Sequence, residues 1–171
     1  MLRHILCAGL FLLLPSAALA GPATSVRAPN VAIQSLTLDD LRLLLDDLGA
    51  TFIAAGRNDA GAAFVFGQMP DGLTFGAYTV CGNADGTDCR GLEFMAVFGT
   101  DMTVADISRI DRDYAAVSLY KADDGSVHVS RYVILDYGIT WANLIENANV
   151  FHMLCGKVID RLEGPSGQQP Q

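Results

Sequence analysis

A pair of cysteines encloses the segment of this chain that most resembles a chemical site. Three residues between Cys81 and Cys89 have the spacing of positions three, five and six of a calcium-binding loop: Asn83, Asp85 and Gly86. This alignment places Leu92 at position twelve, where calcium loops carry a bidentate glutamate, and Glu93 comes one residue too late. We therefore interpret the segment as a polar hairpin loop whose ends, Cys81 and Cys89, are joined by a disulfide.

A second pair of reactive side chains stands further along the chain. His152 and Cys155 are three residues apart, which would place two metal ligands, or a thiol and its base, on one face of a helix. Two ligands do not make a zinc site, and His128 is the only other histidine after the first 20 residues. Cys155 also lies on the apolar stripe of a predicted helix, where a free cysteine packs as a small hydrophobe. We expect a free, buried thiol.

The sequence contains no motif of a known catalytic or cofactor-binding site. It has no HExxH of zinc proteases, no Gly-x-Ser-x-Gly of hydrolases and no phosphate-binding glycine loop. Adjacent acids occur where a helix is expected to begin, on a helix face and in a turn, where carboxylates are usually solvated: Asp39-Asp40, Asp46-Asp47 and Asp123-Asp124. We therefore predict no catalytic, cofactor-binding or metal-binding residues, and a protein that is not an enzyme.

The first 20 residues are typical of a secretory signal peptide. A positively charged start is followed by an apolar run over 5–14 and by the small-x-small sequence Ala18-Leu19-Ala20. The apolar run is too short to span a bilayer, which takes about 20 residues. We predict cleavage after Ala20 and a periplasmic or secreted protein, in an oxidising compartment that allows the disulfide.

Charge indicates which partners to expect. Loss of residues 1–20 removes one arginine and leaves ten basic residues against nineteen acidic ones. Such a surface repels the phosphates of nucleic acids and anionic lipids, whose binding depends on lysine and arginine. The sequence therefore predicts no nucleic-acid binding. No second apolar run is long enough to span a bilayer, so we also expect no stable membrane insertion after signal cleavage.

Between a flexible lead-in, residues 21–35, and a disordered tail, residues 163–171, the sequence predicts a single α+β domain over 36–162. Three apolar stripes at helical spacing follow the N-cap candidates Thr37, Thr103 and Thr140, and the second stripe runs to Tyr114. Six strands are indicated by apolar and alternating runs between turn residues: 51–55, 62–68, 73–80, 90–98, 116–121 and 126–135.

The element order is α-β-β-β-β-α-β-β-α, and the tight turns between strands predict an antiparallel sheet. Strand 90–98 is apolar at nearly every position. We expect this strand to be central and covered on both faces.

The register of the last hairpin predicts a candidate partner-binding face. A three-residue turn, Asp123-Asp124-Gly125, pairs Leu119 with Val129 and keeps the valines on the core side. The opposite face then gathers five side chains: Ser118, Tyr120, His128, Ser130 and Tyr132. Because amphipathic aromatic residues are enriched at interfaces, Tyr120, His128 and Tyr132 are the candidate partner-binding residues. The alternative is an ordinary solvated sheet face, or one covered by a helix.

Several segments together resemble the YbjN family, described as bacterial sensory transduction regulators. They are Leu38-Asp39-Asp40-Leu41, Asp71-Gly72-Leu73-Thr74-Phe75, the Cys81/Cys89 loop before a Leu-x-Phe strand, Asp123-Asp124-Gly125 and Gly138-Ile139-Thr140-Trp141-Ala142-Asn143-Leu144. The resemblance covers 36–162. In the second helix the family usually carries Asn-x-x-Asn around a tryptophan, where this chain has Ser108, Ile110 and Asp111.

The resemblance implies a fold like that of type III secretion chaperones, with helices packed on an antiparallel sheet. It also implies a non-catalytic role in regulation or protein binding, and it transfers no catalytic residue. The alternative function is a small-ligand-binding protein or a hydrolase with an unrecognised site. A deep pocket with convergent polar groups would favour this alternative, and a broad exposed surface would favour protein binding.

Export gives the first testable prediction. N-terminal sequencing of the secreted protein should begin at Gly21, because Ala18-Leu19-Ala20 is the cleavage motif. A mature protein that still carried residues 2–20 would contradict the prediction of a cleaved signal peptide.

Overall fold

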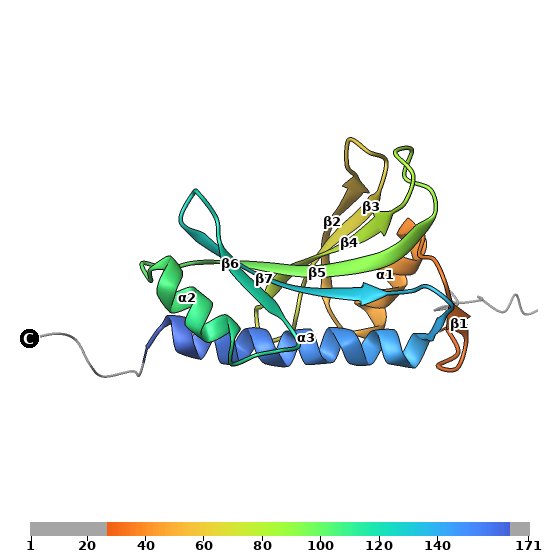
Figure 1. The fold of residues 1–171 in the computed structure, drawn as a ribbon. Helices are drawn as coiled ribbons and strands as arrows, with labels where there is room; N and C mark the ends of the chain where they lie inside the picture. The colour runs from red at the N-terminus through yellow and green to blue at the C-terminus, as the bar shows by residue number, and fades with distance from the viewer. Residues whose placement is uncertain (1–26, 165–171) are drawn as a thin grey trace, which may run out of the picture.

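The structure is a computed structural model that describes residues 27–164, and an antiparallel sheet of six strands forms its centre (Figure 1). In spatial order the strands are β2 (Thr51–Arg57), β3 (Ala63–Gln68), β4 (Thr74–Cys81), β5 (Cys89–Gly99), β7 (Ser126–Ile134) and β6 (Ser118–Lys121). The α+β class and the antiparallel sheet are confirmed. The predicted signal peptide and the predicted tail from residue 165 onward lie outside the described residues.

Three helices accompany the sheet: α1 (Leu38–Asp47), α2 (Val104–Asp111) and α3 (Trp141–Leu162). Each begins after a predicted threonine N-cap, whose side-chain oxygen accepts a hydrogen bond from the backbone N–H three residues later. The apolar stripe predicted for the second helix ran to Tyr114. In the structure α2 ends before Tyr114, which lies in the turn that follows. Within 27–164 no helix has the length and apolar character needed to cross a membrane.

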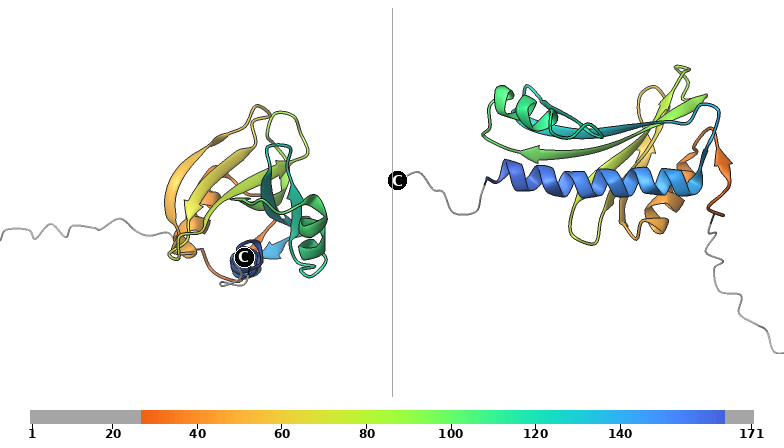
Figure 2. Two further views of the ribbon diagram at one scale, coloured as in Figure 1. Left: turned by 90° about the vertical axis from the view of Figure 1, so that its left-hand side faces the viewer. Right: turned by 60° about the horizontal axis from the view of Figure 1, so that its bottom comes forward.

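The sheet curves around α3, and the helices lie on the concave side (Figures 1 and 2). At the centre of the core Phe75 of β4, Phe94 of β5 and Phe151 of α3 contact one another, with ring centroids 5.7–6.4 Å apart. α1 packs against β2 and β3, and α2 lies beside β6. Burial of this single face of the sheet accounts for most of the apolar core.

The strand β5 corrects one expectation. It is central, between β4 and β7, but the helices cover only one of its faces. Leu92 and Phe94 are fully buried toward α3, whereas Glu93 and Met95 are partly exposed on the other face and Val97 is 53% exposed. The prediction of cover on both faces is wrong because apolar side chains on a sheet surface can pack against their cross-strand neighbours without a second layer.

The described part of the predicted lead-in also differs from the expectation of flexibility. Two short strands that were not predicted, β1 (Ala32–Ile33) and β8 (Ile139–Thr140), pair with each other in antiparallel fashion. Ile33 is buried in the core. The order of this segment comes from contacts with residues more than 100 positions away, which local sequence patterns do not encode.

Trp141, the first residue of α3, joins the N-terminal segment and α1 to the rest of the fold. Its backbone N–H donates to the carbonyl oxygen of Val31 at 2.9 Å, and its indole N–H donates to Asp47 Oδ2 at 2.6 Å. The guanidinium of Arg27 lies over the indole ring, 4.9 Å from its centroid, and forms an ion pair with Asp40 of α1. One buried side chain thereby links segments from three parts of the chain.

This arrangement predicts a specific loss of stability in Asp47→Ala. The substitution leaves the indole N–H of the buried Trp141 without an acceptor, which we expect to lower the free energy of unfolding by about 1–3 kcal/mol. Asp46→Ala is the matched control, because Asp46 is an exposed acid in the same helical turn and its removal changes the charge equally. Equal effects of the two variants in urea denaturation would show that the indole hydrogen bond contributes nothing.

Candidate functional site

The convex face of the sheet, which we call the outward face, carries a continuous set of apolar and aromatic side chains. Across the strands they are Phe64, Phe66, Tyr78, Val80, Met95, Val97, Tyr120, His128, Tyr132 and Ile134. Among residues 27–164 no helix covers this face (Figure 2). Five of these side chains are more than a third exposed: Val80, Val97, Tyr120, Tyr132 and Ile134.

The structure places all three candidate residues from the hairpin register on the outward face. Leu119 pairs with Val129, as predicted, and Tyr120 therefore pairs with His128 on the opposite side. The two rings stack with centroids 4.7 Å apart, and the Tyr120 hydroxyl lies 3.0 Å from His128 Nδ1. Gly125 has a positive φ of 86°, as the three-residue turn requires.

A single row of side chains crosses this face from β3 to β7. The register pairs Phe64 with Tyr78, Tyr78 with Glu93 and Glu93 with Tyr132. Glu93 thus stands between two tyrosines, one on each neighbouring strand. Cross-strand partners have Cβ atoms about 4.5–5.5 Å apart, so the three side chains form one local site.

Two glycines allow these tyrosine rings to lie flat on the sheet. A Cβ atom at Gly76 would stand 2.5 Å from the nearest Tyr78 ring atom, and one at Gly91 would stand 2.1 Å from the Tyr132 hydroxyl oxygen. Both separations are far too short for real atoms, so any larger residue at these positions would displace the ring. Each tyrosine therefore lies over a glycine, and Tyr132 remains 53% exposed.

Glu93 is the only Asp, Glu, Lys or Arg on the outward face of the six strands. It forms no ion pair and no side-chain hydrogen bond with any residue in the described range. Burial raises the pKa of Tyr78 above its usual value, and the negative charge of Glu93 raises it further. The site therefore combines one unpaired carboxylate with two tyrosine rings.

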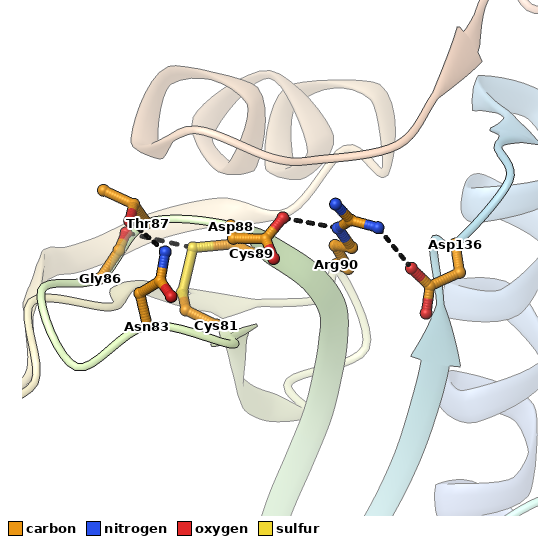
Figure 3. Close-up of polar contacts among 8 residues, drawn as sticks. All are labelled: Cys81, Asn83, Gly86, Thr87, Asp88, Cys89, Arg90 and Asp136. Atoms are coloured by element: carbon orange, nitrogen blue, oxygen red, sulfur yellow. Dashed lines mark hydrogen bonds and ion pairs between the residues drawn. A yellow bond between two sulfur atoms is a disulfide. The ribbon is translucent and has the colours of Figure 1, made fainter.

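The disulfide loop borders this site at one end of the sheet. Cys81 and Cys89 are joined as predicted (Figure 3). Asp85 accepts hydrogen bonds from the backbone N–H and the hydroxyl of Thr87, and Asn83 donates to the same hydroxyl oxygen at 2.9 Å. The loop's polar groups are thus engaged with one another, which agrees with a hairpin loop.

Contacts at its base and at its tip hold the disulfide loop in place. Arg90, which follows the loop, forms ion pairs with Asp88 and with Asp136 beyond the end of β7 (Figure 3). At its tip, the backbone at Gly86 packs directly against Gly61 in the turn between β2 and β3, and both glycines have positive φ angles.

An open hollow of about 470 Å³ lies between these two hairpin tips and the outward face. It is lined by Asn58, Ala60, Ala62, Tyr78, Thr79, Val80, Cys81, Asn83, Glu93 and Met95. Two members of the tyrosine–glutamate row therefore form part of its wall. Asn58 and Asn83 also line it, but Asn58 Oδ1 accepts from the backbone N–H groups of Ala60 and Ala62, and Asn83 Nδ2 donates to Thr87.

His152 and Cys155, the second pair of reactive side chains considered in the sequence, do not act together in the structure. Cys155 is free and buried, as expected, and burial raises the pKa of its thiol to about 12. His152 instead donates from Nε2 to Asp71 Oδ2 at 2.6 Å, and this hydrogen bond, with one from the backbone N–H of Leu73, lowers the pKa of Asp71. Residues 27–164 contain no group of three or more His, Cys, Asp or Glu side chains that could hold a metal.

The chain matches no known family model and no curated protein sequence.

Sequence reasoning found the hairpin residues of this face but missed Tyr78, Glu93 and Met95. Their alternation with the core residues of strands 73–80 and 90–98 was visible in the sequence. The pairing of β5 with β7 was not, because an intervening helix and strand separate them along the chain. Without that pairing, Tyr132 could not be placed beside Glu93.

The electrostatics of the row predict the titration of Tyr78. Its ionisation should occur above the usual tyrosine pKa of about 10, because both burial and the Glu93 carboxylate disfavour the phenolate. In a spectrophotometric titration, Tyr78→Phe should remove this late step, and Glu93→Gln should move it to lower pH. Glu146→Gln, which removes an exposed acid on α3, is the control and should leave it unchanged. An identical Tyr78 step in Glu93→Gln would show that the carboxylate does not act on this ring.

Proposed function

We propose that this chain is an exported, non-catalytic protein-binding or regulatory module of the YbjN type, and that the outward face of its sheet binds the partner. The observation that carries this proposal is the lack of any covering layer, within the described residues, over a face with five exposed apolar or aromatic side chains. Exposed apolar side chains that gather on one face, rather than being scattered singly, are a mark of interaction sites.

The composition of the face supports a protein partner. Tyrosine and methionine are enriched at protein interfaces, and charged residues are depleted at interface cores. The outward face has this composition, since Tyr78, Met95, Tyr120 and Tyr132 surround a single charged residue, Glu93. By contrast, the chain as a whole carries 19 acidic residues.

The arrangement of elements supports the proposed fold type. A helix, four strands, a second helix, two strands and a long third helix follow one another, with the helices on one side of the sheet. This is the arrangement expected of a type III secretion chaperone-like domain, and two short strands, β1 and β8, are added to it. The disulfide at Cys81–Cys89 suits an oxidising compartment and therefore supports export.

The shape of the surface favours this function over binding or hydrolysis of a small ligand. The hollow beside Glu93 is open to solvent and continuous with the outward face, whereas small-molecule sites usually enclose most of their ligand. The one carboxylate in its lining, Glu93, has no hydroxyl or thiol hydrogen-bonded to it among the described residues, so the hollow shows no paired nucleophile and base.

The decisive experiment is crosslinking of the native protein in its own compartment, followed by identification of its partners. In Tyr120→Ala/Tyr132→Ala we expect capture of the partner to fall at least about tenfold, because truncating central interface aromatics typically costs ~2 kcal/mol or more each. The control Val104→Ala/Met153→Ala removes two exposed apolar side chains from the helical side of the molecule and should capture normally. Circular dichroism should show both variants folded.

Equal capture by the wild type and the tyrosine variant would contradict the assignment of the outward face. Loss of capture in both variants would show that the effect is not specific to this face.

A further inference from the structure

We infer that Glu93, Tyr78 and Tyr132 form a subsite for a guanidinium group, so that the bound partner segment presents an arginine side chain to the outward face. This inference rests on the proposed function and specifies the chemistry of the partner. It follows from three features of the site: an unpaired carboxylate, two flat rings beside it and room for a long side chain.

The first feature is the state of the Glu93 carboxylate. It is only partly exposed and has no basic partner among the described residues, although Arg27, Arg90, Arg109 and Arg161 all form ion pairs elsewhere. A partner that covers the outward face would remove the remaining water from this carboxylate. Because burial of an unpaired charge is costly, the bound state requires a cation opposite Glu93.

The second feature is the orientation of the neighbouring rings. One side of the Tyr78 ring and one side of the Tyr132 ring lie against Gly76 and Gly91, so the opposite sides point away from the sheet. The face of an aromatic ring attracts a cation placed over it. Two such ring faces next to a carboxylate therefore favour a cation that can stack on a ring and form an ion pair with Glu93 at the same time.

The third feature is the shape of the space. The open hollow of about 470 Å³ begins at Tyr78, Glu93 and Met95 and extends toward the two hairpin tips. An arginine side chain can lay its methylene groups along Val80, on the side of the hairpin tips, while its charged end reaches Glu93. The net charge of −8 over the whole chain also attracts basic segments from a distance.

These features favour arginine over lysine. The guanidinium is planar, stacks on aromatic faces and matches a carboxylate with two parallel hydrogen bonds, whereas the lysine ammonium is a compact and strongly hydrated charge. The flat tyrosine rings suit the planar group. An uncharged apolar segment would instead leave Glu93 buried without a partner.

The test uses two matched peptides and the secreted protein. The peptides are acetyl-Thr-Val-Arg-Val-Thr-amide and the same peptide with citrulline, which keeps the shape of arginine without its charge. Binding is measured at low ionic strength by NMR titration, following the backbone amide signals of Gly76 and Gly91. We expect the arginine peptide to bind at least about tenfold more tightly than the citrulline peptide, since a charge-assisted contact replaces a neutral one.

The variant Glu93→Gln should reduce the affinity for the arginine peptide to that of the citrulline peptide. Glu146→Gln removes the same charge from the exposed face of α3 and should keep the wild-type preference. Acetyl-arginine-amide tests the source of the guanidinium, and it should bind much more weakly than the peptide. Equal affinity for this small molecule would contradict a peptide partner.

Equal binding of the arginine and citrulline peptides would overturn the guanidinium subsite, and so would the failure of both peptides to bind. Equal weakening in Glu93→Gln and Glu146→Gln would also overturn it, because the effect would then be one of net charge. None of these results bears on the crosslinking comparison of Tyr120→Ala/Tyr132→Ala with its control, so the proposed function is judged separately.

Discussion

Burial of one face of the sheet against α3 is the constraint on which the rest of this structure depends. Phe75 and Phe94 on the sheet meet Phe151 on the helix, and the fully buried Leu92 and Val158 extend the contact. Because side chains alternate along a strand, committing these residues to the core commits their neighbours to the opposite side. The outward face, including Glu93, is therefore a direct consequence of how the core packs.

The start and the middle of α3 are held in different ways. At its start, Trp141 is buried and bonded to both Val31 and Asp47, so the N-terminal segment closes over the helix. Further along, His152 bonds to Asp71 in the turn between β3 and β4. With the helix fixed to the sheet at these points, the curvature of the sheet is set, and the convex side remains without cover from the described residues.

The sequence predicted those parts of the fold that local patterns determine. Thr37, Thr103 and Thr140 marked the three helices because N-caps are local signals, and the turn at Gly125 determined the hairpin register. The pairing of β1 with β8 and the contact of Asp47 with Trp141 join residues far apart in the chain, and no local pattern indicates them. For the same reason only part of the candidate site was predicted from the sequence. Tyr132 was assigned to the face opposite the core, but its cross-strand neighbour Glu93 was not.

A lone carboxylate within an aromatic row affects selectivity more than affinity. In the free protein Glu93 keeps part of its hydration, and its neighbours Tyr78 and Tyr132 still pack over their glycines. The carboxylate therefore lowers the stability of the free protein only slightly. A wholly apolar partner would have to dehydrate the carboxylate without compensation, which works against indiscriminate hydrophobic association. A partner with a correctly placed cation would avoid that cost. Under the proposed function, Glu93 thus disfavours wholly apolar partners and favours a segment that carries a cation.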